Sequence, residues 1–252
     1  MKLTYILIAS FFSIASFAQH AVNITDKNAE WKKYHQLNEK TYDGMLMRNN
    51  IEYDLRDGKI NAYRILQNTE IEAEFEVRYD DNGQVLQEMK IFDSGRGIVR
   101  EVVYKSNLLF DTKKNLIDDG EFIYSKFVNG RPQIATSKDY NEEKKQGSKK
   151  SFSYDENGLL KLEKSRTEGE TIRTTTVTTY KYDQCNNIVE VSNRISEQNA
   201  DTSKKKRNNL VIASKPTVEK INYEYEYNGC LWTKKYIITD GKKQLLAERS
   251  FE

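Results

Sequence analysis

Short turn sequences that pair Asn or Asp with Gly recur along most of this chain, each between runs of β-branched and aromatic residues. The clearest hairpin pattern is TIRTTTVTTYKYDQCNNIVEVSNRI, residues 171–195, in which a polar cluster at 183–187, with Asn in place of Gly, separates two β-rich runs. This pattern predicts a β-hairpin, because Asn, Asp and Gly accept the left-handed backbone angles of tight turns. We therefore expect an all-β chain.

The remaining turns follow one another at short intervals toward the C-terminus. They are Asp57-Gly58, Asn82-Gly83, Asn129-Gly130, Asn157-Gly158, Asn228-Gly229 and Asp240-Gly241. Pro132 and Pro216 are the only prolines, so the strand interiors keep their backbone donors. Evenly spaced short strands with such turns predict an antiparallel meander and argue against βαβ units.

Strict alternation supports strands in the C-terminal part. In VEKINYEYEY, residues 218–227, Tyr223, Tyr225 and Tyr227 are expected on one face of a strand. After the next turn, Trp232 and Tyr236 are expected to share a face. Such rings usually stabilise a sheet through cross-strand pairs worth about 0.2–1 kcal/mol each. The alternative is that Trp232 and Tyr236 stack on a ligand such as a glycan.

Four turns carry a more specific pattern. They read YDDNG (79–83), YDENGLL (154–160), YDQCNNI (182–188) and YEYNGCL (225–231). They resemble the Tyr-Asp-x-x-Gly-x-Leu core of YD repeats, also called RHS repeats, with Asn186 in place of Gly and Glu226 in place of Asp. In that family the hairpins stack into curved antiparallel sheets, and carbohydrate-binding or toxin-associated roles are attached to some members. The resemblance implies an exported bacterial protein whose few repeats form a curved sheet or half-barrel.

The N-terminus has the pattern of an export signal. Residues 1–18, MKLTYILIASFFSIASFA, place one Lys before an apolar run and small residues at both cleavage positions, which predicts a secretory signal peptide. The alternative is a membrane anchor, but the apolar run is interrupted by Ser and Thr and falls short of the ~20 residues that a span needs. No later segment is apolar enough to span a membrane. We expect a periplasmic or secreted protein.

Residues 19–47 show no β pattern and are expected to form a lead-in with at most a short helix, before a β domain at 48–252. The only histidines, His20 and His35, lie here. They are expected to be exposed polar residues, because no recognisable ligand spacing accompanies them. We predict no metal site and no cofactor.

The composition limits the function without naming it. Lys and Arg total 40 against 38 Asp and Glu, which argues against nucleic acid as a partner. The basic run Lys204–Arg207 is interpreted as part of a solvated loop, with an anionic-surface patch as the alternative. No phosphate-binding loop or nucleophile motif is present in the sequence.

We predict a non-catalytic binding or structural module of the cell envelope whose partner is a glycan or an envelope protein. A protein-interaction or immunity-type role is one alternative. A glycoside hydrolase is another, since that reaction needs only two placed carboxyl groups. The acids of the repeated turns, Asp80, Asp155 and Asp183, are more simply explained as turn residues.

Cys185 and Cys230, the only cysteines, both fall in copies of the repeated turn. Alternate turns of a meander lie at the same edge of the sheet, and an exported protein reaches an oxidising compartment. A Cys185–Cys230 disulfide is therefore predicted, with two free thiols as the alternative.

Export can be tested by the mass of the purified protein. Protein from an exporting bacterial host is expected to lack Met1 to Ala18 and to begin at Gln19, because signal peptidase cleaves after the small residue. Intact-mass spectrometry measures this directly. Full-length protein recovered in the membrane fraction would contradict the prediction.

Overall fold

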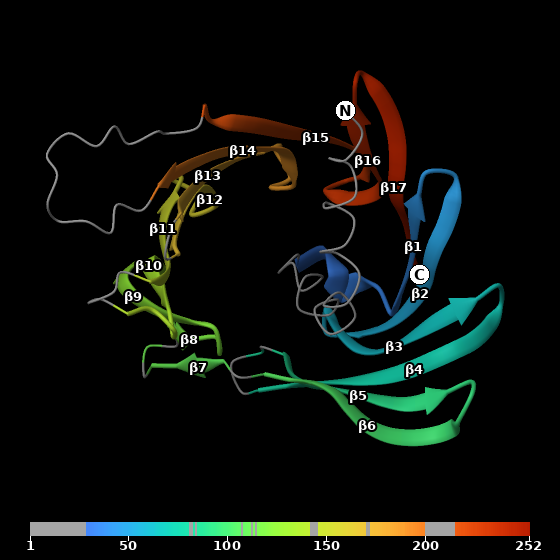
Figure 1. Ribbon diagram of the computed structural model, residues 1–252. Coiled ribbons are helices and arrows are strands. Elements are labelled where there is room, and N and C mark those ends of the chain that lie inside the picture. The colour runs from blue at the N-terminus through green and yellow to red at the C-terminus, as the bar shows by residue number, and fades with distance from the viewer. Residues whose placement is uncertain are drawn as a thin grey trace, which may run out of the picture. The chain divides into compact units, whose positions relative to one another are not determined.

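The computed structural model describes residues 29–80, 83, 85–106, 108–111, 113, 115–141, 146–169, 172–199 and 215–252. The predicted signal peptide, His20 and Lys204–Arg207 lie outside these ranges. The chain forms one 17-stranded sheet, and every ladder between described residues is antiparallel (Figure 1). The predicted all-β antiparallel meander is therefore confirmed.

One 3-10 helix precedes the strands: η1 (Ala29–Lys33). The strands are β1 (Gln36–Asp43), β2 (Leu46–Arg56), β3 (Lys59–Gln67), β4 (Glu70–Tyr79), β5 (Val85–Asp93), β6 (Gly97–Lys105), β7 (Leu109–Phe110), β8 (Leu116–Asp118), β9 (Phe122–Val128), β10 (Arg131–Ser137), β11 (Gly147–Tyr154), β12 (Leu160–Glu168), β13 (Ile172–Tyr182), β14 (Ile188–Asn199), β15 (Thr217–Asn228), β16 (Leu231–Thr239) and β17 (Lys242–Phe251). Among the described residues, no helix is long and apolar enough to cross a bilayer.

The strands divide between two compact units. Unit 1 holds residues up to Ser106 together with 225–236 and 244–252, and unit 2 holds 107–224 and 237–243. Unit 1 therefore contains η1, β1 to β6 and parts of the last three strands. Unit 2 contains β7 to β14, the first part of β15 and the hairpin tip between β16 and β17.

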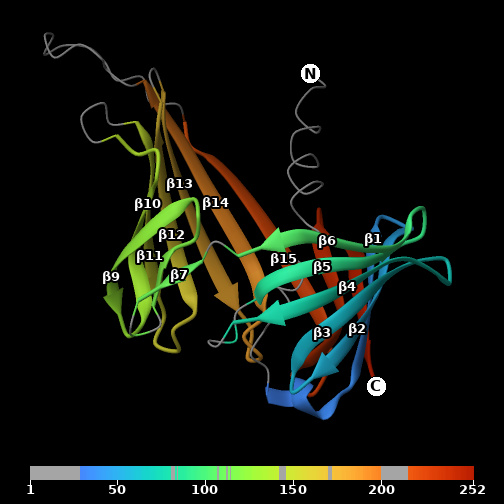
Figure 2. The ribbon, with the colours of Figure 1, turned by 90° about the horizontal axis from the view of Figure 1, so that it is seen from below.

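Unit 1 contains most of the buried apolar side chains. A ring stack crosses three strands: Tyr53 lies opposite Tyr63, and Tyr63 lies opposite Phe75 with ring centroids 4.6 Å apart. Trp31 of η1 packs on the same cluster and is only 3% exposed. η1 lies beside the β2–β3 turn, where a Cβ on Gly58 would meet Lys32 (Figure 2). Burying aromatic rings of this size gives unit 1 a conventional core.

The ladders of unit 1 are interrupted by register shifts in β1 to β5, for example between Asp54 and Leu55 and between Ile65 and Leu66. Each shift adds a residue to one strand, which increases the local twist and bends the strand. The bent strands β2 to β5 are visible in Figure 1.

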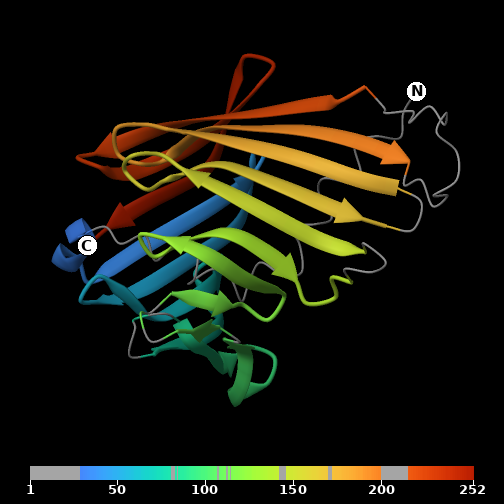
Figure 3. The same cartoon turned by 90° about the vertical axis from the view of Figure 1, so that its left-hand side faces the viewer.

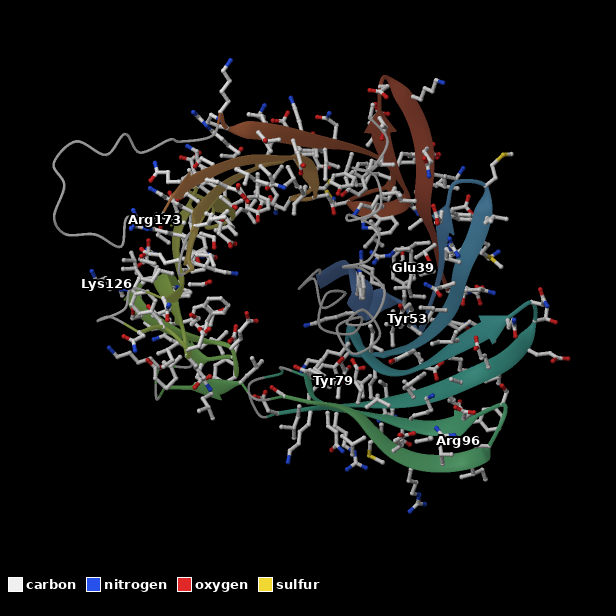
Figure 4. All side chains as sticks on the ribbon, in the orientation of Figure 1. Glu39, Tyr53, Tyr79, Arg96, Lys126 and Arg173 are labelled. Atoms are coloured by element: carbon white, nitrogen blue, oxygen red, sulfur yellow. The ribbon has the colours of Figure 1, made fainter. Side chains whose placement is uncertain are left out.

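A buried ion pair joins the first strand of unit 1 to the last. Glu39 of β1 accepts a hydrogen bond from Arg249 Nε of β17 at 2.6 Å, and the two side chains are 7% and 10% exposed. The Arg249 guanidinium lies 3.7 Å from the Trp232 ring centroid and 5.7 Å from that of Trp31. Figure 4 shows Glu39 and Tyr53 on the same side of their strands. Aromatic rings thus replace water around this charged pair.

The lead-in predicted for 19–47 is wrong in its second half. Residues 36–43 form β1, which pairs with both β2 and β17. Its sequence, QLNEKTYD, hides the alternation because the inward-facing positions include Glu39, which is buried through its pair with Arg249. η1 and the positions of the later strands agree with the expectation.

Unit 2 has far less buried apolar surface. Among its described residues only Phe122 and Ala135 are buried apolar side chains. Its sheet is made of long, closely registered strands, such as β13 and β14, which pair from Ile172–Asn199 to Tyr182–Ile188. Figure 3 shows the yellow and orange strands of this unit side by side. Ladders and turns, rather than a thick core, order this part of the chain.

The buried pair can be tested by mutation. Glu39→Ala is expected to lower the free energy of unfolding by about 3–5 kcal/mol, because it leaves the Arg249 charge buried and unpaired. The matched control is Asp43→Ala, which removes an exposed pair with Arg48 and should cost no more than about 1 kcal/mol. Denaturant unfolding measures both. Equal effects of the two substitutions would show that the pair is unimportant.

Candidate ligand-binding groove

Three turns share one backbone hydrogen bond, from the fourth residue after a Tyr to the carbonyl of the Asp that follows this Tyr, and we call them the Tyr–Asp turns. They begin at Tyr79, Tyr154 and Tyr182, the last residues of β4, β11 and β13. In each, the fourth residue after Tyr has a positive φ: 76° at Gly83, 81° at Gly158 and 65° at Asn186. Gly and Asn tolerate this region best, so the substitution of Asn186 for Gly preserves the turn.

The Asp of the turn binds the turn backbone. Asp155 Oδ1 accepts a hydrogen bond from Leu159 N at 2.8 Å. Asp183 Oδ1 accepts from Cys185 N at 2.8 Å and from Asn187 N at 3.0 Å. These bonds satisfy turn N–H groups that have no partner in the strand ladders. The sequence-based interpretation of Asp155 and Asp183 as turn residues agrees with this geometry.

The Tyr of each turn reaches back to the preceding strand. Tyr79 donates its hydroxyl to the carbonyl oxygen of Ile60 at 2.7 Å. Tyr154 donates to Pro132, and Tyr182 to Leu160, each at 2.9 Å. In every case the acceptor lies two residues after a glycine with positive φ in the previous turn at that edge, namely Gly58, Gly130 and Gly158. Each tyrosine therefore clamps its turn to the one before it.

One further turn resembles the Tyr–Asp turns without matching their sequence, and one turn that matches part of the sequence differs from them. Asp111 Oδ1 accepts hydrogen bonds from Lys113 N and Asn115 N, both at 2.8 Å, which repeats the Asp183 arrangement after a Phe instead of a Tyr. The fourth predicted copy, at 225–231, is a short hairpin turn at Gly229 and Cys230. Its Glu226 instead accepts a hydrogen bond from Tyr236 on the next strand.

Two successive Tyr–Asp turns of unit 2 enclose a groove of about 400 Å³. The volume lies in the range of small-molecule sites. The turn after β11 and the turn after β13 form its walls, and β12 and β13 add side chains between them. The lining residues are Asp155, Asn157, Leu159, Lys161, Tyr180, Lys181, Tyr182, Asp183 and Asn186.

The groove combines hydrogen-bonding groups with aromatic rings. Burial, and then the negative charge of Asp155, raise the pKa of Tyr182, so its hydroxyl stays protonated and keeps donating to Leu160. Burial, followed by the charge of Glu163, raises the pKa of Tyr180. Carboxylates, amides and ammonium groups can bind a polyhydroxylated ligand through many hydrogen bonds, and a tyrosine ring offers a flat apolar surface.

The predicted stacking residues, Trp232 and Tyr236, contact different side chains. Trp232 contacts Tyr225, with ring centroids 6.1 Å apart, and is covered by Arg249. Tyr236 donates to Glu226 at 2.6 Å, which, together with burial, raises its pKa to about 12. Trp232 and Tyr236 thus have different partners in the structure. Stacking of the two rings on a ligand stays a prediction.

Cys185 and Cys230 are both disulfide-bonded in the structure. Cys185 belongs to the Tyr–Asp turn at 182–188. His35 contributes backbone bonds to unit 1, since its N–H donates to Glu252 and its carbonyl accepts from Leu55. No cluster of three or more His, Cys, Asp or Glu side chains suited to a metal ion occurs among the described residues.

Comparison with known proteins adds no assignment. No protein-family model matches this chain, and no curated protein matches it.

The clamps predict the effect of removing single hydroxyl groups. Tyr154→Phe and Tyr182→Phe are each expected to lower the free energy of unfolding by about 0.5–1.5 kcal/mol, because each removes a hydrogen bond to a backbone carbonyl. Tyr180→Phe is the control on the same sheet, because no hydrogen bond of its hydroxyl is found among the described residues. Thermal and urea unfolding measure the differences. A Tyr180→Phe effect as large as that of the clamp variants would refute this role.

Proposed function

We propose that this protein is an exported, non-catalytic binding module of the cell envelope, and that the groove between the Tyr–Asp turns of unit 2 binds a glycan. The observation that carries the proposal is the combination lining one groove: two tyrosines together with carboxylate, amide and ammonium groups. Sugars present hydroxyl groups at their edges and apolar C–H surfaces on their faces. The groove matches both features.

The rigidity of the groove walls supports binding. The clamp from Tyr182 to Leu160 ties the second turn to the strand that follows the first turn. Asp155 and Asp183 hold their own turns closed through backbone amides. A site whose walls are ordered before the ligand arrives loses less conformational entropy on binding.

The same bonds favour binding over glycoside hydrolysis. A glycosidase needs one carboxyl group to give a proton to the glycosidic oxygen and another to act as base or nucleophile. In the groove, the Oδ1 atoms of Asp155 and Asp183 already accept hydrogen bonds from turn amides. Their roles in the fold account for their presence.

Two features support an extracytoplasmic location. The sequence begins with the pattern of a signal peptide. Both cysteines are disulfide-bonded, and structural disulfides are typical of oxidising compartments.

Glycan binding can be tested on an array of bacterial and host glycans, with affinities then measured in solution. Tyr180→Ala is expected to weaken binding by about tenfold, because it removes the ring surface of the groove. Asn157→Ala, an exposed groove residue, should also weaken binding, whereas Tyr180→Phe should keep the wild-type affinity. These substitutions leave the three clamps intact.

Tyr223→Ala is the matched control, because this tyrosine lies on β15 of unit 2 and outside the groove. Binding that is lost equally in Tyr223→Ala and Tyr180→Ala would place the glycan elsewhere. Absence of any glycan binding by the wild-type protein would end the proposal.

One observation favours a protein partner as the second candidate. The β1–β2 hairpin of unit 1 exposes Met45 and Leu46, which are 95% and 67% accessible. Exposed apolar side chains of this size often mark protein contacts. The double variant Met45→Ser/Leu46→Ser should then lose capture of an envelope protein while glycan binding is unchanged.

A further inference from the structure

One face of the unit 2 sheet is strongly basic, and we call it the basic face. On β11 to β14, register and alternation place six cationic side chains on this face with two carboxylates, Glu168 and Glu190. The cations are Lys149, Lys164, Arg166, Arg173, Lys181 and Arg194. The opposite face of these four strands carries two lysines and two glutamates. The near-neutral total charge of the chain conceals this separation.

The basic face contains a defined pocket at the β11–β12 ladder. Lys149 and Arg166 are direct cross-strand partners. With Tyr140 and Glu168 they line a pocket of about 260 Å³. Like charges placed opposite each other destabilise a sheet. A second anion bound between the two cations would reduce this repulsion.

The two arginines at this pocket, Arg166 and Arg173, share one carboxylate. Glu168 forms ion pairs with both arginines: Oε1 lies 2.8 Å from Nε of Arg166, and Oε2 lies 3.5 Å from a terminal nitrogen of Arg173. Nε of Arg173 is buried and has no hydrogen-bond partner among the described residues. One carboxylate thus serves two guanidinium groups, although each guanidinium has five N–H donors. Arg173 is labelled in Figure 4.

Tyr140, the remaining residue that lines the pocket, is held in place because its backbone lies close to that of Gly147. Lys149 Nζ lies 4.1 Å from the ring centroid of Tyr140. A Cβ on Gly147 would lie 2.7 Å from Tyr140 Cα, and Gly147 has a φ of 105°. Only glycine fits this position. The loop that carries Tyr140 is therefore held against β11, and its ring closes the pocket beside the two cations.

We propose that this pocket binds a phosphate or sulfate group. Arg166, which lines the pocket, and Arg173, which shares Glu168 with it, carry planar donor groups that match the oxygens of such an oxyanion. Lys149 adds a compact positive charge. Glu168 orients both guanidinium groups through its ion pairs with Arg166 and Arg173. The remaining cations of the basic face raise the local concentration of anions. This inference is independent of the glycan proposal, because the groove is a separate pocket formed by the Tyr–Asp turns.

The test is calorimetric titration of the purified protein with inorganic phosphate and with sulfate, at an ionic strength held constant with sodium chloride. Saturable binding of at least one of the two oxyanions is expected. The double variant Arg166→Gln/Arg173→Gln should weaken it by about tenfold or more, because charge-assisted hydrogen bonds are lost. Arg166→Lys should bind with intermediate affinity, since it keeps the charge and loses the planar fork.

Arg194→Gln is the matched control, because it removes the same charge from the basic face at a position outside the pocket. It is expected to change the affinity by no more than about twofold, since exposed charges are screened by salt. No saturable binding of phosphate or sulfate would overturn the proposal, as would an equal loss in Arg194→Gln. Near-UV circular dichroism of each variant verifies that it is folded.

Discussion

The ladder between β1 and β17 is the interaction on which unit 1 depends. Every other ladder between described residues joins strands that follow one another in the chain, whereas the Arg249–Glu39 bond in this ladder spans 210 residues. The N–H of His35 donates to Glu252 at 2.8 Å, and the N–H of Glu252 donates to Gln36 at 3.0 Å. Closing so long a loop is entropically costly. The core around Trp31 is complete only when the last strand has paired with the first.

The two units are ordered by different forces. Unit 1 buries stacked rings and aliphatic side chains, which form an apolar core on one face of its sheet. Unit 2 buries little apolar surface among its described residues and relies on long ladders, Asp-stabilised turns and tyrosine clamps. Because neither face of this sheet is covered by a large apolar core, polar and charged side chains can be exposed on both faces. The same strands, β11 to β14, can therefore carry both the groove and the basic face.

The features that the sequence predicted are those decided by local chemistry. Three predicted hairpin turns have a positive φ at both central residues: Asp57-Gly58, Asn129-Gly130 and Asp240-Gly241. Asp, Asn and Gly tolerate this backbone region best, so the residue types alone predict the turns. The clamped turns were visible because Tyr, Asp and Gly recur at fixed spacing. The related turn at Asp111 was missed because Phe and Lys occupy the Tyr and Gly positions.

The errors came from long-range pairing. β1 was not recognised because the burial of Glu39 depends on Arg249, far along the chain. The partners of Trp232 and Tyr236, which are Arg249 and Glu226, were not predicted either, because the alternation of a strand does not identify its cross-strand contacts. The basic face was invisible because its cations lie on different strands and are brought together only by the register of the ladders.

The tyrosine clamps also determine how strands can be added to this sheet by gene duplication. Each clamp joins a turn only to its neighbour at the same edge, so no clamp depends on the total number of strands. Tandem duplication of one two-strand segment, such as β12 with β13, would supply a new acceptor carbonyl and a new tyrosine together. The sheet can therefore widen by whole duplicated segments without disturbing the existing turns, as in proteins whose stability is a sum over neighbouring repeats. Differences in length among related chains would then arise in steps of two strands, at positions between clamps.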